Sequence, residues 1–228
     1  MSVAAFIDVV APIAVRLRLE GSPIFPSLRI AQAGLETGWK LTPWNNLVGL
    51  KVGSRPPNAY WKGDYVNKET WEVVSGKRID VVEAFRAYDS VEDGFRDQDE
   101  LFMLPRYAGV RTARTPEEQA EQLLAGGYAT DPAYADKIKG VIRQYGLKRY
   151  DEEVIRVLEA LQKQIQTLQD RIAVLEAQHV VAEMPSWARQ AVDAAVASGV
   201  VDTPEAGSYD FYRLITVMHR LGLFSKSN

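Results

Sequence analysis

The stretch of sequence that decides the fold is AQAGLETGW, at residues 31–39. Together with Leu28 it keeps the spacing of one helical face through Leu35, and Gly38 is placed to end the helix. Glu36 therefore falls in the last turn of an apolar helix rich in small residues. Burial and the negative end of the helix dipole both disfavour a charged carboxylate there, so we expect a raised pKa for Glu36. Such an acid can donate a proton near neutral pH, whereas the plainer alternative is a surface glutamate before a helix end.

The chain contains few kinds of reactive side chain. It has no Cys, and its two histidines are His179 and His219. The first 178 residues therefore contain no Cys–His pair, no Ser–His–Asp triad and no zinc site built from His or Cys. If this region is an enzyme, carboxylates are the best candidates for its acid–base chemistry, and we expect neither a metal nor a cofactor.

The composition is that of a globular protein able to bury a core. Of the 228 residues, 46% are hydrophobic and 25% are charged, and the net charge of -3 gives no pull toward nucleic acid or membrane. The segment Met1–Val15 is apolar but contains Asp8 and lacks a basic leader, so we interpret it as a first core helix rather than a signal peptide. No stretch is long and apolar enough to span a bilayer.

From Phe6 to about Tyr150 the sequence shows several helix starts. Ser90 and Asp93 form an acidic variant of the capping box, and residues 115–118 place Pro at a first helical position. Residues 131–134 are a third start, and Gly146 ends that helix. This region is therefore predicted to be mostly helical.

A long loop and one hairpin interrupt the helices. The loop, rich in Gly, Pro and Asn, runs from about Thr42 to Lys68. Two apparent strands follow at about 70–74 and 81–88, and residues 75–77 supply the turn. We therefore expect a helical domain with a small hairpin.

Between about Asp151 and His179 the apolar residues recur with a period of seven. One core position of the repeat is occupied by Leu158, Ile165 and Ile172, and the other by Val154, Leu161, Leu168 and Leu175. More than three heptads without Pro or Gly predict a coiled coil, and this choice of residues favours a parallel homodimer. The alternative is one amphipathic helix that packs back on the first domain.

The remaining segment, 183–228, predicts a small unit of two helices. One helix begins near Trp187 and ends at Gly199, and the other begins near Tyr212 and ends at Gly222. About forty residues are marginal for independent folding, so this unit needs a second copy or a partner. We therefore divide the chain into residues 1–150, 151–182 and 183–228.

Residues 3–151 resemble a known family through four motifs in order: IAQAGLETGW (30–39), NNLVGLK (45–51), AFRAYDS (84–90) and GYATDPAYA (127–135). The region is similar to the glucosaminidase domain of cell-wall hydrolases of the flagellar-muramidase and autolysin type, glycoside hydrolase family 73. Thr37 stands where the family usually has Ser, and Val48 where it has an aromatic residue. The resemblance implies a lysozyme-like helical fold with an inserted hairpin, and hydrolysis of peptidoglycan glycan strands after N-acetylglucosamine.

The resemblance also implies roles for single residues. Glu36 matches the general acid of the family. Glu72, four residues before Gly76, matches the hairpin glutamate that positions water or stabilises the developing oxocarbenium ion, with Glu69 as a nearby rival. Tyr128 matches an active-site tyrosine expected to contact the N-acetyl group of the reacting sugar.

A further set of residues is expected to bind substrate: Asn46, Trp44, Trp61, Asp131 and Tyr134. The two tryptophans could stack on sugar faces or pack in the core, and for Trp39 we prefer core packing. Asp131 could serve only as a helix N-cap.

The C-terminal unit is similar to short S-layer-homology-like modules that end some Bacillus-type phage and prophage lysins. The similarity rests on residues 187–189, 194–199 and 212–223. It implies attachment to a secondary cell-wall polymer, and the alternative is a plain oligomerisation unit.

Together these features predict a phage or prophage endolysin, made in the host cytoplasm without a signal peptide and released to the cell wall. A host autolysin ranks second. A muramidase or lytic transglycosylase of the same fold is the nearest enzymatic rival. A non-catalytic wall-binding scaffold is disfavoured by the joint presence of Glu36, Glu72 and Tyr128.

Overall fold

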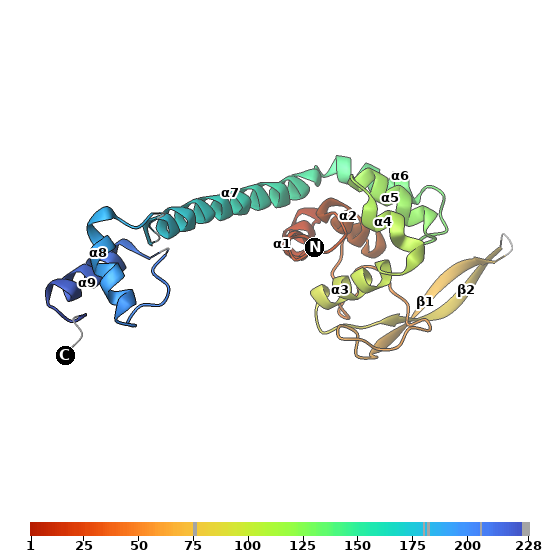
Figure 1. Ribbon diagram of the computed structural model, residues 1–228. Coiled ribbons are helices and arrows are strands. Elements are labelled where there is room, and N and C mark those ends of the chain that lie inside the picture. The colour runs from red at the N-terminus through yellow and green to blue at the C-terminus, as the bar shows by residue number, and fades with distance from the viewer. Residues whose placement is uncertain (75–76, 180, 182, 206, 225–228) are drawn as a thin grey trace. The chain divides into compact units, whose positions relative to one another are not determined.

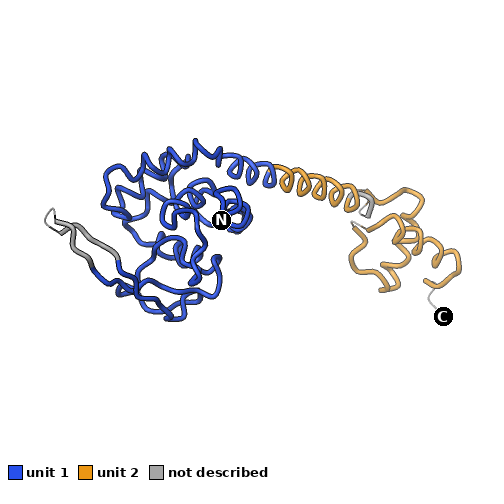
Figure 2. The backbone as a smooth tube through the Cα atoms, turned by 180° about the vertical axis from the view of Figure 1, so that it is seen from behind, with its two compact units in different colours: residues 1–158 blue, residues 159–228 orange. Residues whose placement is uncertain are grey.

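The computed structural model divides the chain into two compact units, residues 1–158 and 159–228 (Figure 2). It describes residues 1–74, 77–179, 181, 183–205 and 207–224, and their side chains except those at 70–80 and 177–179. No helix in these described ranges has both the length and the apolar character needed to cross a membrane.

Two helices at the start of the first unit bury its core. Helix α1 (Val3–Leu19) confirms the predicted first core helix, and the Ser2 hydroxyl caps it by accepting from the Ala5 amide at 3.2 Å. Helix α2 (Pro26–Thr37) is buried from Pro26 to Gly34, and Gly38 ends it at φ 59°, as its position predicted. The core between these helices and the later ones is built from apolar side chains that include Phe6, Val10, Leu28, Ile30, Phe95, Phe102, Leu123, Ile138 and Ile142.

In chain order a hairpin follows α2 and precedes the remaining helices, and it projects outward from the helical body (Figure 1). Strands β1 (Tyr65–Val74) and β2 (Lys77–Arg86) pair antiparallel, with Tyr65 opposite Arg86 and Val74 opposite Lys77. Both strands are longer than predicted, because β1 begins inside the segment taken as loop and β2 begins at the expected turn. Most of these extra positions carry polar residues, with Val66 and Ile79 among the exceptions, and cross-strand pairing rather than an apolar pattern holds them in the ribbon. Turn residues 75 and 76 lie outside the described residues.

Two helices after the hairpin start at the capping residues that the sequence predicted, Ser90 and Thr115. In α3 (Val91–Phe102) the Ser90 hydroxyl accepts from the Asp93 amide at 3.1 Å and donates to its carboxylate at 2.6 Å. The 3₁₀ turn η1 (Pro105–Tyr107) and α4 (Ala108–Thr112) lead to α5 (Pro116–Ala125), which Thr115 caps, and to α6 (Tyr134–Gln144).

Helix α7 (Lys148–His179) confirms one continuous helix through the heptad region. Its first turns belong to the first unit. The Asp151 carboxylate accepts from the Ser27 amide at 2.9 Å, and Val154 is buried. Asp151 thus caps the start of α2, whose own N-cap residue, Phe25, offers no side-chain bond. The compact unit therefore extends to Leu158, beyond the boundary at residue 150 drawn from the sequence.

The second unit contains the two predicted short helices. The 3₁₀ turn η2 (Ser186–Ala188) leads into α8 (Arg189–Ala197), and α9 (Tyr209–Arg220) follows a loop. Tyr212 is fully buried, donates to the Pro204 carbonyl at 3.0 Å and accepts from the Gly207 amide at 3.2 Å. The small core consists of Ala188, Ala191, Val192, Ala195, Tyr212, Ile215 and Phe224.

Candidate active site

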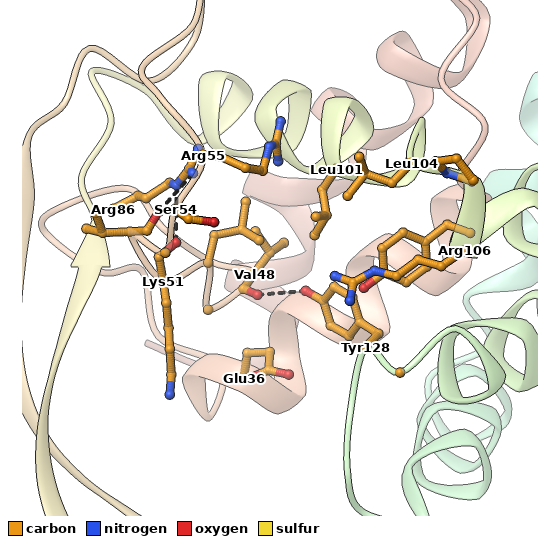
Figure 3. Close-up of a pocket in the computed structure, with 17 residues that line it drawn as sticks. Glu36, Val48, Lys51, Ser54, Arg55, Arg86, Leu101, Leu104, Arg106 and Tyr128 are labelled. Atoms are coloured by element: carbon orange, nitrogen blue, oxygen red, sulfur yellow. Dashed lines mark hydrogen bonds between the residues drawn. The ribbon is translucent and has the colours of Figure 1, made fainter.

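The Glu36 side chain lies where two hollows of the first unit meet. The larger hollow has a volume of about 810 Å³ and the smaller one about 280 Å³, and both are lined by Glu36 and Gly49. The larger one is bordered by the loop 48–55, by α3 and η1, and by Tyr128 (Figure 3). A chain-like ligand could therefore extend to both sides of this carboxylate.

The pKa of the Glu36 carboxyl is raised, as the sequence predicted, although the side chain is exposed to the cleft. Glu36 is the penultimate residue of α2, whose first nine residues are buried, and it follows the exposed Leu35. Its side chain is open to the cleft, but the surrounding protein removes part of its water, and this burial raises the pKa of the Glu36 carboxyl. A raised pKa keeps more of the acid protonated toward neutral pH, as proton donation requires.

Trp39 shapes the end of the helix rather than the cleft. It has a φ of 62°, and its ring lies 5.6 Å from the ring of Phe6 and 4.8 Å from that of Tyr145. A Cβ on Gly34 would lie 2.6 Å from the Trp39 ring, so only glycine fits under the indole. The preferred core-packing interpretation of Trp39 is confirmed.

Gly49 brings a loop against the catalytic candidate. Its φ is +67°, and a Cβ there would lie 3.2 Å from Glu36 Oε2. Buried Asn46 holds this loop: its Nδ2 donates to the carbonyls of Leu50 at 2.8 Å and Arg86 at 2.9 Å, and its Oδ1 accepts from the Leu50 amide at 3.1 Å. Asn46 also lines the smaller hollow, so it supports the site while facing it.

Tyr128 is held by a chain of buried amides. Its hydroxyl donates to the Val48 carbonyl at 2.8 Å and accepts from Gln98 Nε2 at 3.2 Å. Gln98 also donates to Gln32 Oε1 at 2.7 Å, and Gln32 donates to the Tyr134 hydroxyl at 2.8 Å. Burial raises the pKa of Tyr128 well above its usual value, so the phenol stays neutral. Tyr128 lines the larger hollow, whereas Tyr134 is buried in the core and lines neither hollow.

A buried ion pair holds the part of the loop 48–55 that lines the larger hollow. Arg86 Nη1 lies 2.7 Å from Asp97 Oδ2, and both side chains are almost completely buried. Arg86 also donates to the carbonyls of Lys51 at 3.2 Å and Val52 at 3.0 Å. The pair thereby ties the loop to β2 and α3.

The expected stacking role of Trp61 does not fit this arrangement. Trp61 is only 3% exposed, the Arg86 guanidinium covers its ring at 3.9 Å, and its indole N–H donates to the Asp64 carbonyl at 2.7 Å. The Arg86 guanidinium covers the face of the ring, so Trp61 packs inside the protein and is not available to stack on a sugar.

Trp44 does line the smaller hollow, together with Lys68 and Glu69. The Lys68 ammonium lies 4.8 Å from the centre of the Trp44 ring. Glu72 occupies a β1 position opposite Ile79, but its side chain lies outside the described residues.

Asp131 lies at the start of α6 and lines neither hollow. It accepts from the Ala133 amide at 2.9 Å and from the Lys137 ammonium at 2.6 Å. These contacts favour the helix-start role over the substrate-binding one, although the N-cap residue itself is Ala133. Within the described part of the chain, no group of three or more His, Asp or Glu side chains is placed to hold a metal ion.

The fold and the cleft define a class of protein: a lysozyme-like helical domain with an inserted hairpin and a carboxylic acid in the cleft. The chain belongs to the glucosaminidase family, described as mannosyl-glycoprotein endo-beta-N-acetylglucosaminidase, whose family model matches residues 13–147.

Relatives and solved structures agree with this family. The chain is 37% identical over 139 residues to "Exo-glucosaminidase LytG" of Bacillus subtilis, covering 57% of this chain and 47% of that protein. It is 37% identical over 154 residues to "Peptidoglycan hydrolase FlgJ" of Salmonella typhimurium, covering 64% and 46%. The chain thus spans less than half the length of these two curated relatives. A mutant peptidoglycan hydrolase from Sphingomonas sp. A1 superposes with a TM-score of 0.55 at 38% identity, covering 65% of this chain and 98% of that one.

Proposed function

We propose that the first unit hydrolyses the glycan strand of peptidoglycan as an endo-β-N-acetylglucosaminidase. The observation that carries the proposal is Glu36, an acid of raised pKa placed where the two hollows meet. Relatives named peptidoglycan hydrolase, exo-glucosaminidase and autolysin support the substrate class. In this function Glu36 protonates the glycosidic oxygen as the bond breaks.

A second carboxylate from the hairpin would act from the other side of the sugar. The resemblance assigns this role to Glu72, a β1 residue four positions beyond Lys68, which lines the smaller hollow. Glu69 borders the smaller hollow itself, so it stays the rival. A carboxylate on a hairpin can leave room for a water, as inversion requires, and the acetamido group of the substrate offers a second route.

Mass spectrometry of digested peptidoglycan tests the bond that is cleaved. We expect N-acetylglucosamine at the new reducing ends. Reducing N-acetylmuramic acid would instead establish a muramidase, which is the activity named for a Lactococcus lactis relative that is 32% identical over 159 residues. Anhydro ends would establish a lytic transglycosylase. Early release of long oligosaccharides separates the proposed endo cleavage from the exo cleavage named for the Bacillus subtilis relative.

We propose that α7 forms a parallel two-stranded coiled coil with a second copy of the chain. Its heptad residues Leu158, Leu161, Ile165, Leu168, Ile172 and Leu175 are each 48–56% exposed in the single chain. Such a row of half-exposed apolar side chains along one helix is what pairing would bury.

Sedimentation equilibrium of the full chain tests this proposal, with Ile165→Asp as the disrupting variant. We expect a dimer for the unchanged protein and a monomer for the variant. Thr167→Asp, on the same exposed helix but outside the two core positions, is the matched control and should remain a dimer. A monomeric unchanged protein at tens of micromolar would contradict the proposal.

We propose that the second unit binds a secondary cell-wall polymer, in the setting of a phage or prophage endolysin. The support is the order of segments: a catalytic unit, a long helix and a small separate core. Pairing through α7 would bring two such units to one wall and raise affinity through avidity. Cosedimentation with purified cell walls, before and after removal of wall polymers, tests the binding.

A further inference from the structure

The larger hollow carries a marked excess of positive charge. Its described lining contains four cationic side chains, those of Lys51, Arg55, Arg86 and Arg106. Glu36 is the one acidic side chain among the lining residues. Peptidoglycan sugars carry no charge on their rings, so this excess is not needed to hold the sugar backbone itself.

Two of the four cations are already neutralised. Arg86 is buried and paired with Asp97 at 2.7 Å. Lys51 pairs with Glu83 at 3.3 Å. Each of these two side chains therefore has a carboxylate partner within the protein that balances its charge.

Arg55 keeps its charge available. It is 3.8 Å from Asp97 Oδ1, too far for a hydrogen bond, and that oxygen already accepts from Asn58 at 2.7 Å. The other Asp97 oxygen accepts from Arg86 and from Tyr88, each at 2.7 Å. One carboxylate thus faces two guanidinium groups, and the partly exposed one, Arg55, is in surplus.

Arg106 is the second available cation. It is exposed, its guanidinium lies 4.7 Å from the centre of the Tyr107 ring, and it forms no ion pair with any carboxylate that the structure describes. In Figure 3, Leu101 and Leu104 lie between Arg55 and Arg106, while Glu36 lies on the other side of Val48. The two arginines thus flank an apolar wall of the larger hollow.

We propose that this wall binds the stem peptide of peptidoglycan, with Arg55 and Arg106 receiving its carboxylates. The proposal rests on the function proposed above and names the part of the substrate that the larger hollow takes. Stem peptides hang from the muramic acid residues of the glycan, so they project sideways from the strand and carry its acidic groups. Arginine matches carboxylates through paired N–H donors, and a hollow of about 810 Å³ has room for such a branch.

Binding to three forms of one soluble glycan tests the proposal. The strands, freed of phosphate-containing wall polymers, are compared with intact peptides, with peptides removed by an amidase and the lactyl carboxylates that this exposes then amidated, and with peptide carboxylates chemically amidated. Full-length Glu36→Gln protein binds them without turnover. We expect about tenfold tighter binding of the intact form than of the other two, with a difference that shrinks as salt is added.

The same measurement is repeated with Arg55→Gln and Arg106→Gln added to the Glu36→Gln protein. We expect the preference for the intact form to fall toward onefold. The matched control is Arg143→Gln, an exposed arginine of α6 that lines neither hollow, which should keep the preference. The amidated strands test the charge with no change in the protein, so a poorly folding variant does not remove the test.

The outcomes separate this proposal from the proposed activity. Equal binding of all three forms overturns the peptide site, even if the unchanged enzyme cleaves the strands. Retention of the preference in the double arginine variant overturns it as well. Preference for the intact form, without cleavage by the unchanged enzyme, supports the site and refutes the activity.

Discussion

Replacing Gly49 with alanine would add one methyl group against Glu36, the proposed general acid. The new Cβ would lie 3.2 Å from Glu36 Oε2 and 3.7 Å from Glu36 Cδ, and the first distance is tighter than an ordinary contact. The carboxyl would have to move by a few tenths of an ångström and would lose water on that side. The φ of +67° also disfavours any side chain.

These two effects have separate magnitudes. A left-handed backbone costs a non-glycine residue about 1–2 kcal/mol, and each 1 kcal/mol lowers the Tm of a protein of this size by about 2–4 °C. Displacement of a catalytic group by about 1 Å can cost 10²-fold, so a smaller shift of Glu36 should lower activity by about tenfold. Further loss of water raises the pKa of Glu36, so the fall in activity at high pH should move to higher pH.

Gly146→Ala is the matched control. Gly146 has a φ of +58°, lines neither hollow, and its added Cβ would meet only Arg149 Nη1, at an ordinary 3.7 Å. Thermal unfolding and turbidity loss of a peptidoglycan suspension, across pH, are measured for both variants. Equal losses of Tm with a loss of activity confined to Gly49→Ala are expected. If the two variants keep the same activity, the contact with Glu36 has no catalytic consequence.

Four further substitutions test the site. Glu36→Gln should lower hydrolysis by at least ~10²-fold, because the amide cannot donate the proton, and turbidity assays with a circular dichroism control measure it. Because burial raises the folded-state pKa of Glu36 above its unfolded value, its favourable contribution is complete below the unfolded pKa and is lost as pH rises through the folded one. The glutamine variant should therefore match the unchanged protein in denaturant unfolding at pH 4 or below and be at least as stable at pH 7; lower stability at pH 7 would contradict the buried-acid assignment. Glu72→Gln should lower activity more than Glu69→Gln in the same turbidity assay, and the reverse order would assign the second carboxylate to Glu69. Asp97→Asn should lower the free energy of unfolding by about 3–5 kcal/mol, because it leaves buried Arg86 without its counter-charge, and urea unfolding that shows a loss below 1 kcal/mol would refute that role.

Local signals made most of the helices predictable. Ser90, Thr115 and Gly38 act on backbone groups three or four residues away, so their effect can be recognised from neighbouring sequence. The raised pKa of Glu36 was predictable for the same reason, since the apolar helix around it is contiguous in sequence.

The rest of the site depends on contacts between distant residues. Trp61 is buried by Arg86, 25 positions away, and nothing near Trp61 in the sequence announces that partner. The extra length of β1 follows from pairing with β2, although residues such as Asn67 and Lys68 carry no strand signal of their own. The amide chain from Gln32 through Gln98 to Tyr128 was missed as well, because polar side chains in helices show no partner until the helices are packed.

Because the first turns of α7 pack within the first unit, they limit where this chain can be truncated. A shortened protein that stops at residue 150 would lose the Asp151 carboxylate that accepts from the Ser27 amide, and would uncover the side chains packed around Val154. The end of α2 that loses this cap is the start of the helix whose other end carries Glu36. An expression fragment meant to isolate catalysis should therefore run through Leu158. Any domain exchange that keeps the enzyme intact should place its junction in the later, exposed turns of the helix, in step with the seven-residue repeat.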